Sequence, residues 1–292
     1  MSSIGDPRRA FVVERPRDVE AFLARAGAFM GGHEAQNNLA FGVCSNLRAN
    51  PAIRASARFA VVAAGAGGPV VGAALQTPPF RLVIAETEEL EAIDALEEAF
   101  IDDVVPGVIG STEAAARFAE RRGARTRRPA TLVMAERIYQ LTEVREPRPA
   151  PGALRIAEPA DVALIAAWFR AFAAEALADP VEDAEVVAER WVARIGRTVY
   201  LWQDGATTVS MCAIGGLTPR GIRVGPVYTP PEHRGRGYAS KLVAEVSQAQ
   251  LEAGRTFVFL FADVSNPTSN RIYQAIGYEP VSDVAEYRFD EP

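Results

Sequence analysis

The sequence contains little of the chemistry that several common kinds of site require. Two cysteines, Cys44 and Cys212, lie far apart and only two histidines are present, so neither a disulfide framework nor a Cys/His metal site is expected. Lys241 is the single lysine among 31 basic residues, which we attribute to coding bias. No run of 18 apolar residues and no apolar signal core is present, so we expect a cytoplasmic protein without a membrane partner.

Length and net charge narrow the kinds of protein that the sequence can encode. A chain of 292 residues favours two domains, each able to bury its own core. Hydrophobic residues make up 49% and charged residues 23% of the chain, which is ordinary globular composition. The net charge of −6 argues against non-specific nucleic-acid binding, so no nucleic-acid partner is expected.

The most informative stretch is residues 224–240. It predicts a strand that ends in a Pro-rich bend, a loop containing Gly235 and Gly237, and the start of a helix that continues to Ala253. The apolar run 256–263 then has the composition of a buried parallel strand. Glycine lets backbone N–H groups approach a ligand, and a helix N-terminus carries about half a positive charge. The unit therefore predicts a strand–loop–helix–strand anion site suited to a diphosphate.

Spacing separates this loop from the common nucleotide motifs. The dinucleotide pattern G-x-G-x-x-G fails after Gly237, and a Walker loop lacks its Gly-Lys-Ser/Thr. The spacing Arg234-x-x-Gly237-x-Ala239 instead resembles the acyl-CoA signature of the general N-acetyltransferase (GNAT) superfamily. Residues 266–278 are similar to the closing helix of that family and its Gly-aromatic ending. The resemblance implies acetyl-CoA as co-substrate and no metal.

The chain also repeats itself. Residues 10–18 align with residues 153–161; in both copies a short strand runs into Pro and an Asp that caps a helix. We therefore expect an α/β (α+β mixed-sheet) fold of two tandem GNAT-like domains, each with a mostly antiparallel sheet. The expected boundaries are 1–144, a Pro-rich linker 145–152, and 153–292, with the strand 281–289 closing the second domain.

The two copies differ where the anion site falls. The first copy has the acidic stretch 86–94 in place of the glycine loop. Like charges at short range are unfavourable by about 1 kcal/mol per pair even in water, so this half should not bind CoA in the same way. It resembles the degenerate half of tandem GNAT proteins, and its role is structural or acceptor-shaping.

The candidate binding residues follow from the loop and the resemblance. The backbone amides of residues 234–239 are the expected diphosphate donors, with Arg234 or Arg236 as a charged partner and Ser240 or Lys241 within possible reach. The blander alternative is a tight turn with solvated arginines. The resemblance adds the strand that precedes the loop and two asparagines of the last helix, where Asn266 is equally explained as a helix cap. The cofactor-binding set is Val227, Tyr228, Thr229, Arg234, Gly235, Arg236, Gly237, Tyr238, Ala239, Ser240, Asn266 and Asn270.

One catalytic residue is expected, Tyr273. It lies beside the apolar stripe of Ile272 and Ile276, and an aromatic residue there usually belongs to the core. The resemblance implies that it protonates the departing CoA thiolate, which a phenol with a pKa near 10 can do. Asp263, Glu232 and His233 are weak candidates for a general base, and a water chain is equally compatible, so no base is assigned.

The sequence thus predicts an acyl-CoA-dependent (acetyl-CoA-dependent) N-acyltransferase that transfers the acyl group directly to an amine. The acceptor is a small-molecule or peptide amine, and the protein a monomer or homodimer. Two alternatives stay open: a non-catalytic CoA-binding or sensory module, and a protein that binds another diphosphate nucleotide.

Overall fold

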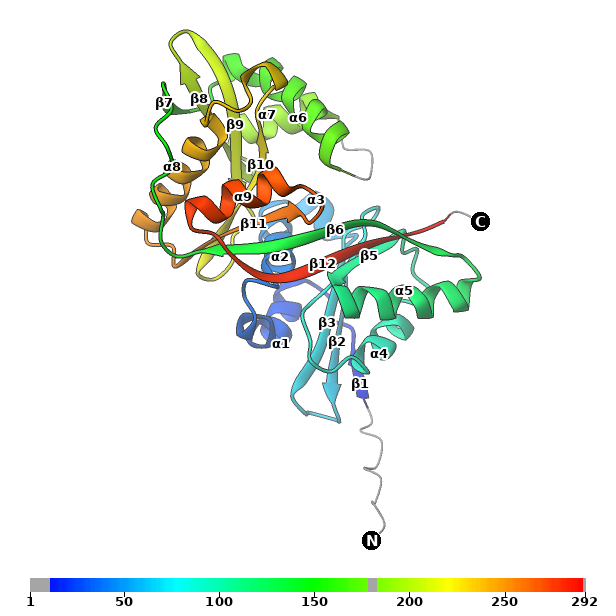
Figure 1. Cartoon of the computed structure of the whole chain (residues 1–292). Helices are drawn as coiled ribbons and strands as arrows, with labels where there is room; N and C mark the ends of the chain where they lie inside the picture. The colour runs from blue at the N-terminus through cyan, green and yellow to red at the C-terminus, as the bar shows by residue number, and fades with distance from the viewer. Residues whose placement is uncertain (1–10, 178–182, 291–292) are drawn as a thin grey trace. The chain divides into compact units, whose positions relative to one another are not determined.

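The computed structural model describes residues 11–177 and 183–290 (Figure 1). The chain divides into two compact units, one formed by residues 1–134 and 283–292 and the other by residues 135–282. Both units run through the same order of elements, so the repetition expected from the sequence is present in the architecture.

The first unit begins with a short strand and two helices. In chain order its elements are β1 (Phe11–Glu14), α1 (Val19–Gly32), α2 (Asn38–Ala49), α3 (Pro51–Arg54), β2 (Arg58–Ala64), β3 (Val70–Gln76), β4 (Leu82–Ile84), α4 (Ala92–Ala99), β5 (Gly107–Ser111) and α5 (Thr112–Thr126). Its strands lie in the order β1-β2-β3-β4-β5-β12, where β12 is Glu279–Phe289, and β4 and β5 are parallel. Alternate residues of β2 face two different cores: Ala60 and Val62 pack with α4 and α5, whereas Phe59 and Val61 pack with α1 and α2.

The second unit repeats this plan. Its elements are β7 (Ala153–Ile156), the 3₁₀ turn η1 (Pro159–Asp161), α6 (Val162–Ala176), α7 (Ala184–Val192), β8 (Arg197–Asp204), β9 (Thr207–Gly215), β10 (Gly221–Tyr228), the 3₁₀ turn η2 (Pro231–His233), α8 (Tyr238–Glu252), β11 (Phe257–Asp263) and α9 (Pro267–Ile276). The strand order is β6-β11-β10-β9-β8-β7, where β6 is Ala130–Leu141, and β10 and β11 are parallel. Residues 178–182, which precede α7, lie outside the described residues.

The sheet of the second unit separates two layers of helices (Figure 1). On one face α8 and α9 cover a core that includes Trp202, Cys212 and Leu260. On the other face α6 and α7 cover a core that includes Leu201 and Met211. Because neighbouring residues of a strand point to opposite faces, the sequence of each strand determines which layer each side chain meets.

Two long strands change the expected domain boundaries. β6 (Ala130–Leu141) pairs antiparallel with β11, from Leu141↔Val258 to Glu136↔Asp263. β12 (Glu279–Phe289) pairs with β5 of the first unit, from Val284↔Ser111 to Arg288↔Gly107. The expected closing strand of the second half therefore completes the first unit, and the last strand of the first half completes the second. A period-two pattern shows that a segment is a strand but does not name its neighbour, which is why the sequence misplaced both.

No helix among residues 11–177 and 183–290 has the length and apolar character needed to cross a lipid bilayer.

Candidate functional site

The loop before α8 has the backbone conformation that its glycines permit. Strand β10 ends at Tyr228, η2 follows, and Gly235 and Gly237 have φ of 77° and 85°. These left-handed values are costly for residues with a Cβ, and Gly237 is the N-cap of α8. No atom lies within 4 Å of the position that a Cβ would take at Gly235, so this side of the loop is open.

The backbone amides of this loop are available to a ligand. The N–H of Lys241 donates to the Gly237 carbonyl at 3.0 Å, which is the first bond of the helix. Within the described part of the chain, the N–H groups of residues 235–240 donate to no protein acceptor. The expected donor set started one residue earlier, but the Arg234 N–H already donates to the Pro231 carbonyl at 3.2 Å. Six consecutive N–H groups of this kind lie at the positive end of a 15-residue helix, an arrangement that is favourable for an anion.

The Arg234 side chain is committed to the protein itself. Its Nε donates to the Thr229 carbonyl at 2.8 Å, and its Nη2 bonds the Glu175 carboxylate at 2.7 Å. The guanidinium carbon also lies 5.7 Å from the centre of the Tyr228 ring. Arg234 therefore braces the loop against α6 and β10, and Arg236, which is exposed, is the better placed of the two for a phosphate. Glu175 carried no signal in the sequence because it lies far from the loop along the chain.

A buried side chain fixes the first turn of α8 to the protein core. The Tyr238 side chain is buried, and its hydroxyl donates to Asp204 Oδ2 at 2.6 Å, so it offers a ligand its backbone only. Ala239 and Ser240 are partly exposed. The Lys241 ammonium forms ion pairs with Glu245, at 3.3 Å, and with Glu146, so its charge is already compensated.

Strands β10 and β11 part beside this loop. Their described pairing covers only Gly221↔Phe257 to Arg223↔Phe259, although β10 continues to Tyr228. On its other edge β10 carries a bulge between Val224 and Val227 where it pairs with β9. A strand that leaves its neighbour leaves backbone groups without a sheet partner, and a ligand can use them.

The end of β10 is partly used by side chains of the protein. Ser210 donates to the Tyr228 carbonyl at 3.1 Å and bonds the Thr229 hydroxyl at 2.8 Å. The Thr229 carbonyl is taken by Arg234. Of the three residues expected here, Val227 is the one for which the described residues supply no such side-chain bond.

The two asparagines of α9 have structural partners. The side-chain oxygen of Asn266 accepts from the Ser269 N–H at 3.1 Å, which is a helix cap. Asn270 accepts from the Tyr139 hydroxyl at 2.7 Å and donates to the Asp263 carbonyl at 2.8 Å. These bonds explain both residues without a ligand. Tyr139 comes from β6, so the sequence contained no local sign of it.

Tyr273 lies on α9 against the core that α8 and α9 cover. Its ring meets that of Tyr278 edge-on, with centroids 6.0 Å apart. Burial, and then the neighbouring Cys212 thiol, raise the pKa of Tyr273 above its usual value, so its hydroxyl stays protonated at neutral pH. Cys212 is the partner of Val227 in the pairing of β9 with β10. Because the Cys212 thiol also influences Tyr273, Tyr273 lies near the part of β10 that has left β11. The described residues offer the Tyr273 hydroxyl no hydrogen-bond partner.

The corresponding position of the first unit is built differently. After β4 the Glu86 N–H is taken by the side-chain oxygen of Asn37 at 2.8 Å, and the Glu89 N–H by that of Thr87 at 2.9 Å. Burial raises the pKa of the Glu86 carboxyl. The amides that a diphosphate needs are thus partly occupied there, and carboxylates surround them.

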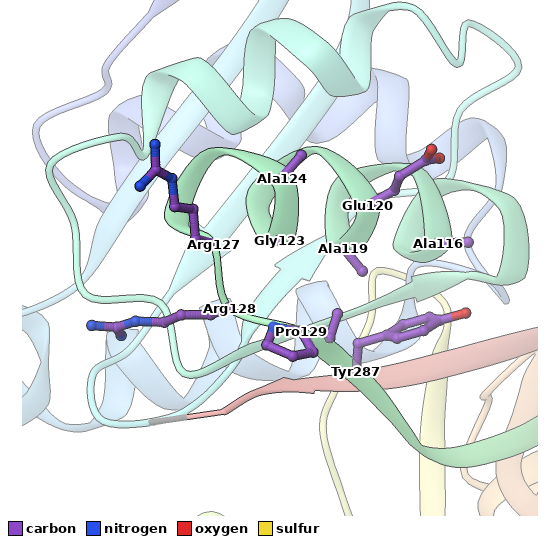
Figure 2. A pocket seen from close by; sticks show the side chains of 10 residues that line it. Ala116, Ala119, Glu120, Gly123, Ala124, Arg127, Arg128, Pro129 and Tyr287 are labelled. Atoms are coloured by element: carbon purple, nitrogen blue, oxygen red, sulfur yellow. The ribbon is translucent and has the colours of Figure 1, made fainter. Parts of the chain in front are cut away.

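A hollow of about 570 Å³ in the first unit is a separate feature. It lies along α5, with Arg127 and Arg128 at one end and Glu120 and Tyr287 at the other (Figure 2). None of the predicted site residues lines it, and its floor is formed by small side chains of the helix. We therefore do not place the candidate site there.

Comparisons with known proteins agree with this fold. Residues 204–288 match the FR47-like protein family, while no curated protein matches the chain. A tandem GNAT protein from the clavulanic acid biosynthesis pathway is 16% identical, with a TM-score of 0.56 over 97% of this chain and 99% of that one. A GCN5-related N-acetyltransferase from Sphaerobacter thermophilus is 17% identical, with a TM-score of 0.57 over 98% and 97%. A Drosophila protein is 13% identical, with a TM-score of 0.65 over 97% and 99%. The chain therefore has the fold of tandem GNAT proteins, and residues 204–288 are similar to the FR47-like family.

Proposed function

We propose that the second unit is an acetyl-CoA-dependent N-acyltransferase that transfers the acyl group directly to an amine. The observation that carries the proposal is the run of N–H groups at residues 235–240 that find no acceptor among the described residues, beside the point where β10 and β11 part. A loop that only turned the chain would not need both features in one place. Residues 204–288, which match the FR47-like family, include both.

The residues present fit the diphosphate of CoA. Charge-assisted hydrogen bonds contribute about 1.5–3 kcal/mol each, so two or three of these amides supply substantial binding energy. Arg236 adds positive charge, while Arg234 holds the loop in shape through Thr229 and Glu175. Bound acetyl-CoA supplies a thioester as the acyl source.

The chain's own residues have two tasks near the diverging strands. The Val227 backbone lies where an N–H can hold a carbonyl oxygen and stabilise the negative charge that develops on it. Tyr273 is protonated at neutral pH, and its hydroxyl is the group that we assign to give a proton to the sulfur as the carbon–sulfur bond breaks. No cysteine nucleophile takes part, because burial raises the pKa of the Cys212 thiol to about 12.

The first unit acts in this proposal as a partner of the catalytic unit rather than as a second CoA site. The occupied amides of Glu86 and Glu89 and the neighbouring carboxylates support that division of roles.

Binding is tested by placing a carboxylate at the loop. Ser240→Asp sits in the first turn of α8, where a negative charge suits the helix and should preserve the fold. The same charge repels a diphosphate by about 1–4 kcal/mol at 4 Å, so the Kd for CoA should rise at least fivefold, and less at high salt. Gln248→Glu, on the exposed side of the same helix, is the matched control. Unchanged CoA affinity in Ser240→Asp contradicts the proposal. NAD and ATP, titrated alongside, identify a site built for another diphosphate.

Catalysis is tested by Tyr273→Phe. Loss of a general acid lowers kcat by about 10²–10⁴-fold, while the Kd for CoA stays near that of the wild type. Release of CoA thiol with a panel of amines gives kcat, and calorimetry gives Kd. Tyr287→Phe in the first unit is the matched control. CoA binding without turnover of any amine identifies the non-catalytic module instead.

A further inference from the structure

Arg197, at the start of β8, lies on the face of the sheet that α6 and α7 cover. It shares that face with Val199 and Leu201, and its guanidinium carbon stands 5.6 Å from the centre of the Trp191 ring. Its Nη1 donates to the carbonyl of Gly225. The residue is only partly exposed, so its charge is drawn into the protein rather than left in solvent.

Two consecutive glycines make room for the arginine. Arg197 pairs with Gly215 of β9, and Gly215 pairs with Arg223 of β10, so the three residues form one row across the sheet. A Cβ at Gly215 would stand 2.7 Å from Cγ of Arg197, and one at Gly216 would stand 3.3 Å from Nη2 of Arg223. Larger residues at these two positions would push both guanidinium groups away from the sheet.

Within residues 11–177 and 183–290, no carboxylate is paired with Arg197. Its described partners are the Gly225 carbonyl and the Trp191 ring, and the like charge of Arg223 repels it. Arg223, in contrast, is attracted by Glu136. Burial, followed by the repulsion from Arg223, lowers the pKa of Arg197 to about 9, which still leaves it charged at neutral pH. A buried charge without a carboxylate is costly, and an incoming anion relieves that cost.

The position of this charge relates it to the proposed reaction. Gly225 lies in the bulged part of β10, two residues before Val227, and extended chain rises about 3.3 Å per residue. The Arg197 guanidinium, which holds the Gly225 carbonyl, therefore lies beside the segment of β10 that leads to Val227. It also lies on the α6/α7 face, whereas α8 and Tyr273 lie on the other. Acyl donor and anion thus approach the parted strands from opposite faces.

We infer that Arg197 binds a carboxylate of the amine acceptor, so that the acceptor is a small amino acid-like molecule. This inference rests on the proposed function. A planar guanidinium binds a carboxylate in a two-pronged arrangement, which also orients the molecule. The spacing suits an acceptor whose amine is a few bonds from its carboxylate. The net charge of −6 does not oppose binding of a carboxylate, because the local charge at Arg197 and Arg223 is positive.

Matched pairs of acceptors test the inference. Glycine and glycinamide, β-alanine and its amide, and longer pairs of the same kind differ in the carboxylate while keeping the amine. We expect kcat/KM of the full-length protein to favour the acids, with a fall of about ten- to a hundredfold for the acids in Arg197→Gln and little change for the amides. Arg197→Lys keeps the positive charge but loses the two-pronged hydrogen bonding of the guanidinium. Its kcat/KM for the acids should lie between the values of the wild type and Arg197→Gln. Arg170→Gln, an exposed arginine of α6, removes the same charge and serves as control.

A binding measurement separates this inference from the proposed function. Thermal shifts with the same acids and amides, without CoA, should show stabilisation by the acids that Arg197→Gln removes, even if no amine is acetylated. The inference is overturned if the wild-type protein shows no preference for acids over amides in either assay. This outcome is measured on the wild-type protein alone, so it does not depend on whether a variant folds. The inference is also overturned if Arg197→Gln lowers the thermal shift and kcat/KM equally for acids and for amides. Arg197 would then act only by holding the Gly225 carbonyl. Failure of CoA to bind, by contrast, contradicts the proposed function alone.

Discussion

The exchange of long strands predicts that the second half of the chain is not stable when cut at its Pro-rich linker. Fragment 145–282 lacks the part of β6 that pairs with β11, whereas fragment 135–282 retains it. The cut removes Tyr139 and Leu141, both 0% exposed and both part of the core under α8 and α9. Burial of a large apolar side chain is worth about 1.5–3 kcal/mol, so the two together contribute about 3–6 kcal/mol.

That loss is large beside the stability of an ordinary domain, which is about 5–15 kcal/mol. The cut also removes the bond from Tyr139 to Asn270. It exposes the edge of β11 (Phe257–Asp263), which begins with five apolar aromatic or branched residues in a row. An apolar edge of this kind pairs with other chains. We therefore expect fragment 145–282 to unfold at much lower urea concentration and to associate.

Urea unfolding followed by tryptophan fluorescence measures the difference, and size-exclusion chromatography measures association. Leu141→Ala in the full-length chain provides an independent estimate, with an expected loss of about 2–5 kcal/mol. If fragment 145–282 is monomeric and within about 1 kcal/mol of fragment 135–282, the assignment of β6 to the second unit is wrong.

Two further predictions concern titratable groups. Arg155 lowers the pKa of Asp161 through hydrogen bonds of 2.6 and 2.8 Å, so the ionised carboxylate stabilises the fold above its usual pKa of 3.8, and the stabilisation is lost as pH falls below that value. Asp161→Asn should thus lower stability by about 1–2 kcal/mol at pH 7, with a shrinking difference from the wild type near pH 3 in urea titrations; an equal difference at both pH values contradicts this. Burial raises the pKa of both thiols, Cys44 and Cys212, to about 12, so a thiol reagent should label neither at pH 8 until denaturant is added. Rapid labelling of the folded protein would show that one of them is accessible.

Local features of the chain were legible in the sequence. The glycines at 235 and 237 specify a left-handed turn because other residues adopt such φ values at a cost, and the helix that follows was marked by its apolar spacing. The order of elements in both halves could be read for the same reason, since each strand and helix has its own period. The loop amides and the place of Tyr273 on α9 follow from this local information.

Contacts between distant segments were decided by the tertiary structure. Strand periodicity assigns side chains to a face but not strands to neighbours, so the exchange of β6 and β12 was invisible in the sequence. Arg234 looked like a phosphate ligand until Glu175, from a helix far along the chain, was found to hold it. Arg197 had no motif at all; its buried charge exists because Gly215 and Arg223 lie in the same row of the sheet. Electrostatic energies depend on distance in space, and only folding sets those distances.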